Sequence, residues 1–110
     1  MKDDLWIDVL AADDLPEDDV VGVTAGKLEL ALYRVAGEVF ATGNLCTHGM
    51  ARLCDGFLDG HVIECPLHQG QFDVRTGQAL CEPAVAPIPK YPVKIEGARV
   101  YVRIEEPIGR

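Results

Sequence analysis

Two short motifs in this chain carry residue types that bind metals. Cys46-Thr47-His48 (the first motif) and Cys65-Pro66-Leu67-His68 (the second motif) each pair one cysteine with one histidine, and sixteen residues separate His48 from Cys65. Thiolate and imidazole ligands suit zinc, copper or iron rather than magnesium or calcium. The side chains of Cys46, His48, Cys65 and His68 therefore form a candidate metal site that two segments of the chain would share.

The order of these ligands separates the possible metals. Structural zinc sites usually group two cysteines and then two histidines, whereas each motif here mixes the two types. Blue copper needs two histidines, one cysteine and a weak axial methionine; Met50 is present, but one cysteine would be left over. A [2Fe–2S] centre with two cysteines on one iron and two histidines on the other uses all four residues. The sequence favours this centre and leaves another metal, or a chance grouping, open.

The other two cysteines, Cys54 and Cys81, do not extend either motif. A set of four cysteines would have spacings of 8, 11 and 16, with no short motif among them. We expect Cys54 and Cys81 to pack as small apolar side chains, and in a reducing compartment we expect no disulfides. His61 stands beside Asp59-Gly60, a hairpin signal, and is expected to be exposed and not a ligand.

Composition and charge narrow the class of protein. A chain of 110 residues with 48% hydrophobic residues predicts a single globular domain spanning 1–110. The sequence has no apolar run long enough for a membrane helix and no apolar leader at its start, so we expect a cytoplasmic protein without a membrane partner. The net charge of −8 argues against nucleic acid. It serves solubility, attraction to a basic partner, or both.

The elements that must position the motifs are short β-strands. Apolar and β-branched runs broken by glycine and proline predict roughly nine strands and an all-β sandwich or barrel. Hairpin turns are expected at residues 25–27, at Asp59-Gly60, at residues 75–77 and at residues 96–99, and one strand is expected over residues 91–95. The second motif would then end the hairpin that turns at Asp59-Gly60.

Beyond the four ligands, the surrounding residues resemble a known family. The segments Cys46-Thr47-His48-Gly49 and Cys65-Pro66-Leu67-His68-Gln69-Gly70-Gln71-Phe72-Asp73 are similar to those of Rieske ferredoxins from bacterial ring-hydroxylating dioxygenases. Residues 43–49, 63–70 and 91–96 are most similar to the naphthalene dioxygenase ferredoxin group, and the resemblance covers nearly the whole chain. It implies the Rieske fold, with three antiparallel sheets and a cluster-binding subdomain of two loops at about residues 43–82.

The resemblance also implies the roles of the residues and the partners. Cys46 and Cys65 would hold the inner iron of one [2Fe–2S] cluster, and His48 and His68 the outer iron near the surface. The chain would be a monomeric electron carrier and not an enzyme. It would pass single electrons from a flavoprotein NAD(P)H-dependent ferredoxin reductase to a terminal oxygenase. With both motif histidines used, only His61 remains, too few for the mononuclear iron site of an oxygenase.

Two other functions are weighed against this one. The small Rieske-like subunit of an assimilatory nitrite reductase shares the fold, but some such subunits have lost the ligands that this chain keeps. A zinc-stabilised binding module is the third possible function.

The residues around the motifs also predict the reduction potential. Compared with the respiratory branch of the family, Ala51 and Leu67 replace two cysteines that form a disulfide, and Gly70 and Phe72 replace two hydroxyl residues. Fewer hydrogen bonds to the cluster predict a reduction potential of about −150 mV.

Overall fold

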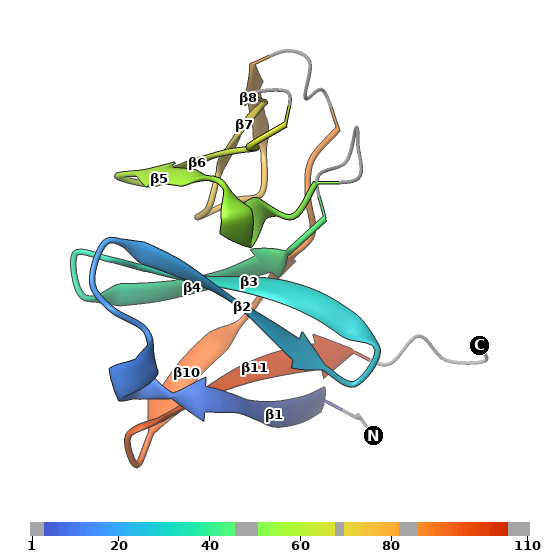
Figure 1. The fold of residues 1–110 in the computed structure, drawn as a ribbon. Coiled ribbons are helices and arrows are strands. Elements are labelled where there is room, and N and C mark those ends of the chain that lie inside the picture. The colour runs from blue at the N-terminus through green and yellow to red at the C-terminus, as the bar shows by residue number, and fades with distance from the viewer. Residues whose placement is uncertain (1–3, 46–50, 68–69, 82–85, 106–110) are drawn as a thin grey trace.

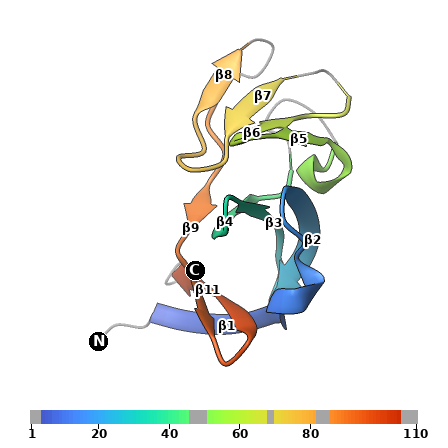
Figure 2. The same ribbon diagram turned by 90° about the vertical axis from the view of Figure 1, so that its left-hand side faces the viewer.

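The fold is built from three antiparallel sheets, stacked along the molecule (Figures 1 and 2). The computed structural model describes residues 4–45, 51–67, 70–81 and 86–105, and within these ranges it has eleven strands and two short 3-10 helices. The prediction of an all-β fold with three antiparallel sheets is confirmed. The outer sheet contains β1 (Asp4–Ala11), β11 (Arg99–Glu105) and β10 (Val93–Glu96). The middle sheet contains β2 (Asp19–Ala25), β3 (Leu28–Val35), β4 (Glu38–Gly43) and β9 (Lys90–Tyr91).

The third sheet lies at one end of the molecule, above the middle sheet in Figure 1. It contains β5 (Phe57–Asp59), β6 (Val62–Glu64), β7 (Gln71–Asp73) and β8 (Ala79–Cys81). The helix η1 (Ala12–Asp14) follows β1, and η2 (Leu53–Asp55) precedes β5. The described residues next to both motifs belong to this end of the molecule: η2 follows the first motif and precedes β5, and β6 leads into the second motif.

The middle sheet is buried on both faces, which explains the nearly continuous apolar sequence of β3. Successive strand residues point to opposite faces, so Leu30 and Leu32 pack with Val100 and Val102 against the outer sheet. Tyr33 points the other way, into a second core shared with the third sheet. Each fully buried leucine stabilises the fold by about 1.5–3 kcal/mol. The middle sheet, on which the third sheet packs, is therefore stabilised by a core on each of its two faces.

Two details of the strands differ from the sequence prediction. Asp59 pairs with Val62, so the hairpin turns at Gly60 and His61, one position later than predicted, with Gly60 at a φ of 59°. The predicted strand over residues 91–95 is two strands in different sheets: Tyr91 pairs with Ala41 of β4 and Val93 with Val102 of β11. Proline lacks the N–H that a central strand needs, and the chain passes from one sheet to the next at Pro92.

No helix in the described ranges is long and apolar enough to cross a membrane.

Candidate metal centre

Of the four predicted ligands, Cys65 is the one that the structure describes. Cys46, His48 and His68 lie outside the described residues, as does Met50. Within the described ranges no three His, Cys, Asp or Glu side chains gather as a metal site. The structure does describe residues next to both motifs, and their contacts show how the chain is held on either side of each motif.

The second motif sits at the end of the β6–β7 hairpin. Glu64 pairs with Gln71 across the two strands, and the Gln71 amide donates to the Glu64 carboxylate at 3.2 Å. One step further on, the Cys65 N–H donates to the Gly70 carbonyl at 2.8 Å. This last bond closes the hairpin directly below residues 66–69, so the position of Cys65 follows from the sheet register.

Cys65 itself belongs to the core beneath the motif. It is fully buried, in one apolar cluster with Leu53, Ile63 and Phe72. By contrast Pro66 is exposed, and the Leu67 side chain is 59% exposed. A buried thiol at the hairpin end, followed by exposed residues, fits the predicted inner ligand, because the thiol is shielded from water.

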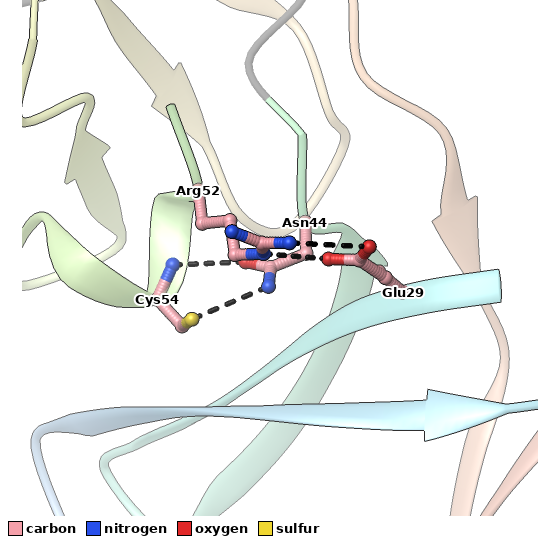
Figure 3. A network of polar contacts seen from close by, with 4 residues as sticks. All are labelled: Glu29, Asn44, Arg52 and Cys54. Carbon is pink, nitrogen blue, oxygen red and sulfur yellow. Dashed lines mark hydrogen bonds and ion pairs between the residues drawn. The ribbon is translucent and has the colours of Figure 1, made fainter. Parts of the chain in front are cut away.

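The first motif is flanked by two residue pairs that together form its neck. Leu45 and Arg52 make an isolated antiparallel bridge on either side of residues 46–51. Directly below, Asn44 contacts η2: its side-chain oxygen accepts the Cys54 N–H at 2.9 Å, and its amide nitrogen donates to the Cys54 sulfur at 3.2 Å (Figure 3). We call these two pairs, Leu45–Arg52 and Asn44–Cys54, the neck of the first motif.

An ion pair fastens the outside of the neck to the middle sheet. The Arg52 guanidinium donates to both carboxylate oxygens of Glu29, at 2.7 and 3.4 Å (Figure 3). The hydrogen bond and the positive charge of Arg52 lower the pKa of Glu29. Both side chains are well exposed, so solvent screens this pair and it adds little to global stability. Its value is geometric, since it fixes the direction of the Arg52 side chain.

A shallow hollow of about 300 Å³ lies between residues that follow the first motif and residues of the second. Ala51, Arg52 and Asp55 line it from the side of the first motif, and Pro66 and Leu67 from the side of the second. Leu45, at 51% exposure, adds a further apolar side chain beside the first motif. Residues that follow the first motif thus share one hollow with residues of the second, as a metal centre held by both motifs requires.

A buried pair of hydroxyls lies below the neck and was not anticipated from the sequence. The Tyr33 hydroxyl and Thr42 Oγ1 are 2.8 Å apart, and Thr42 Oγ1 donates to the Gly43 carbonyl at 2.8 Å. Because the Thr42 proton is used in that bond, Tyr33 is the donor to Thr42. Both side chains are fully buried, and burial raises the pKa of Tyr33 well above its ordinary value. The pair links β3 to β4 within the core.

The remaining cysteines and His61 have distinct environments. Cys54 is partly buried and accepts the Asn44 hydrogen bond, so it packs inside the fold as expected but also has a polar partner. Cys81 is exposed at the end of β8, so the expectation that it packs as a small apolar side chain is wrong. The His61 ring is half-buried rather than exposed and meets the Phe40 ring edge-on, with 5.6 Å between centroids.

Comparisons with known proteins agree with this architecture. The family model described as "Rieske [2Fe-2S] domain" matches residues 5–92. A Ralstonia sp. protein, the ferredoxin component of naphthalene 1,2-dioxygenase/salicylate 5-hydroxylase systems, is 61% identical over 100 residues, which are 91% of this chain and 96% of the relative.

Solved structures of two ferredoxins are also similar. A Sphingomonas yanoikuyae B1 ferredoxin superimposes with a TM-score of 0.87 at 43% identity, covering 92% of this chain and all (100%) of the other. A chain from the complex of reduced oxygenase and oxidized ferredoxin in carbazole 1,9a-dioxygenase has a TM-score of 0.83 at 42% identity, covering 88% of this chain and 91% of that one.

Proposed function

Since this chain belongs to the Rieske [2Fe-2S] family, we propose that it is the electron-carrying ferredoxin component of an aromatic ring-hydroxylating dioxygenase system. It carries out no reaction on the organic substrate. It takes single electrons from a flavoprotein NAD(P)H-dependent reductase and delivers them to the terminal oxygenase. The observation that carries this proposal is the 61% identity, over 91% of the chain, to a protein named as such a ferredoxin component.

Within this proposal, one [2Fe–2S] cluster is held by Cys46 and Cys65 on the inner iron and by His48 and His68 on the outer iron. The bound cluster supplies one reversible electron, and neutral imidazole ligands raise its potential above that of all-cysteine clusters. The buried thiol of Cys65 supports the inner assignment. We also propose that residues 1–110 form one domain, with a cluster-binding subdomain at about residues 43–82.

The chain's own residues have two tasks in this role. Cys65 and the apolar side chains around it keep water away from the inner side of the centre. On the outer side, the exposed side chains of Leu45 and Leu67 offer an apolar rim that a partner can desolvate on contact. Brief complexes of a monomeric cytoplasmic protein fit this exposure, since an electron carrier must leave each partner as readily as it binds.

Metal analysis separates this proposal from a zinc-stabilised module. The purified protein should contain about two iron atoms and two acid-labile sulfides per chain. One zinc ion per chain with no sulfide would refute the cluster. Replacement of a proposed outer ligand, His48→Cys, should lower the midpoint potential of any cluster that assembles, because a thiolate adds negative charge. An unchanged potential in a cluster-bearing variant would contradict the assignment of His48.

Reconstituted turnover separates the proposal from the small subunit of a nitrite reductase. Purified protein, a flavoprotein ferredoxin reductase, NAD(P)H and the terminal oxygenase of a naphthalene-type system should together hydroxylate the aromatic substrate. Omitting this chain should abolish the coupled reaction. If the chain accepts electrons but supports no oxygenase, while it restores nitrite reduction to a catalytic subunit, the nitrite reductase alternative is correct.

A further inference from the structure

We propose that Asn44 is a positioning residue, which uses Cys54 to hold the first motif in the geometry that its two ligands need. The inference deepens the proposed function, because it rests on Cys46 and His48 being cluster ligands. It also assigns a role to Cys54, which is not among the proposed ligands. The role is to accept a hydrogen bond from Asn44 and to fill the space behind the neck.

Asn44 is attached to the rest of the fold at four points. Its N–H donates to the Glu29 carbonyl at 3.0 Å, and its carbonyl accepts the Leu53 N–H at 2.7 Å. The side-chain oxygen accepts the Cys54 N–H at 2.9 Å, and the side-chain nitrogen donates to Cys54 Sγ at 3.2 Å. The residue is only 3% exposed. One buried side chain thus ties the strand that enters the first motif to the helix that follows it (Figure 3).

The contact between Asn44 and Cys54 can restrain the first motif because it lies next to that motif along the chain. Cys46 is two residues after Asn44, and the bridged pair Leu45–Arg52 lies between the tie and residues 46–51. Fixing both ends of a short segment reduces the number of conformations that it can adopt before it meets a metal. A ligand segment that starts from a fixed neck needs less rearrangement to bind the cluster and resists releasing it.

The neighbouring strand is shaped to accept Cys54 at this place. A Cβ atom on Gly22 of β2 would lie 2.8 Å from Cys54 Sγ and 3.3 Å from the Asn44 amide nitrogen. Glycine at this position therefore lets the sulfur and the amide pack directly against the strand backbone. The chemistry also selects asparagine: its amide has both an acceptor for the Cys54 N–H and a donor for the sulfur, whereas a carboxylate has only acceptors.

Two variants remove one or the other partner of the Asn44–Cys54 contact, and a third variant controls for a loss of global stability. Asn44→Ala removes both side-chain bonds, and Cys54→Ala removes only the bond to sulfur. The control is Thr42→Val, which breaks the buried hydrogen bonds of Thr42 near the end of β4, two residues before Asn44, and leaves both bonds between Asn44 and Cys54 in place. Each holoprotein is challenged with an iron chelator while the cluster absorbance is followed, and the reduced cluster is examined by electron paramagnetic resonance.

We expect Asn44→Ala to release the cluster at least about 10-fold faster than the wild type, the lower end of the cost of losing an outer partner of a metal site. The release rate of Cys54→Ala should lie between those of the wild type and Asn44→Ala. Asn44→Asp should rescue part of the loss, since it keeps an acceptor for the Cys54 N–H. The resonance of the reduced cluster should broaden in Asn44→Ala, because the ligands adopt more than one arrangement. Thr42→Val should melt at a lower temperature but keep the wild-type release rate and resonance.

Three results would overturn the inference. One is a wild-type release rate in Asn44→Ala. The second is equally fast release in Thr42→Val, which would mean that only global stability matters. If Asn44→Ala does not fold, Cys54→Ala decides the question, and its release at the wild-type rate would be the third. A wild-type protein that contains no iron or sulfide would instead refute the proposed function itself, so the two failures are distinguishable.

Discussion

Removing the Tyr33 hydroxyl should destabilise the end of β4 by a small and predictable amount. Tyr33 donates to Thr42 Oγ1 at 2.8 Å, and Thr42 keeps its own bond to the Gly43 carbonyl when Tyr33→Phe removes that donor. The variant loses one buried hydrogen bond between neutral groups and leaves no donor unpaired. Its expected cost is about 1 kcal/mol.

Replacing the other partner should cost more, although it also changes a single side chain. Thr42→Val removes both bonds and leaves the Tyr33 hydroxyl without its acceptor in a fully buried apolar cluster. An unsatisfied buried polar group adds its own desolvation penalty, so we expect about 2 kcal/mol. The double variant removes the stranded hydroxyl again. It should therefore cost less than the sum of the single variants, by about 1 kcal/mol.

Native-state hydrogen exchange is the suitable assay, because loss of a metal cluster makes unfolding irreversible and an equilibrium free energy undefined. The backbone amides of β3, such as that of Leu32, should exchange about 5-fold faster in Tyr33→Phe and about 30-fold faster in Thr42→Val. Equal acceleration in the two variants would refute the assigned direction of the hydrogen bond. Strict additivity in the double variant would show that the two hydroxyls are not coupled.

Four further predictions concern pH, packing, potential and salt. Burial raises the pKa of Tyr33, so above pH 10 the unfolded chain loses this proton before the folded chain does. The free energy of unfolding should therefore fall there by up to about 1.4 kcal/mol per pH unit, which lowers the melting temperature. Tyr33→Phe should remove this part of the pH dependence. Gly22→Ala should speed release of the cluster to a chelator, since its Cβ would crowd Cys54 Sγ; wild-type release would show that the neck tolerates the methyl group. Without hydroxyls at Gly70 and Phe72, voltammetry should give a midpoint of about −150 mV, and a clearly positive value would contradict this reasoning. If the charge of −8 steers a basic partner, the electron-transfer rate should fall steeply with ionic strength; a constant rate would mean that the charge serves solubility alone.

Local chemistry explains why the sequence predicted most of the elements well. Alternating apolar runs and glycine turns depend on neighbouring residues, so the turn at residues 25–27, between β2 and β3, could be predicted directly from the chain. The observed turn at Gly60 and His61 lies one position after the predicted one, because the register depends on which residues of the two strands pair. The break at Pro92 could not be placed, because it depends on two different sheets meeting the same short stretch of chain.

The environments of Cys54, Cys81 and His61 show the same limit at the level of side chains. Nothing in the neighbouring sequence distinguishes a cysteine that packs against Asn44 from one that faces solvent at the end of β8. His61 was expected to be exposed because it adjoins a turn. Phe40, more than twenty positions away in the chain, covers one side of its ring. Burial is a property of the assembled sheets and not of the local segment.

The sequence by itself determined the kind of chemistry that this protein can support. Two cysteines and two histidines in mixed motifs select a metal centre by ligand type, and that selection needs no coordinates. Only the tertiary structure decided that Cys65 lies in a closed core, that residues after the first motif and residues of the second line one hollow, and that Asn44 meets Cys54 ten residues away. The physical reason is that ligand affinity belongs to atoms, whereas burial and alignment arise from contacts between strands distant in the chain.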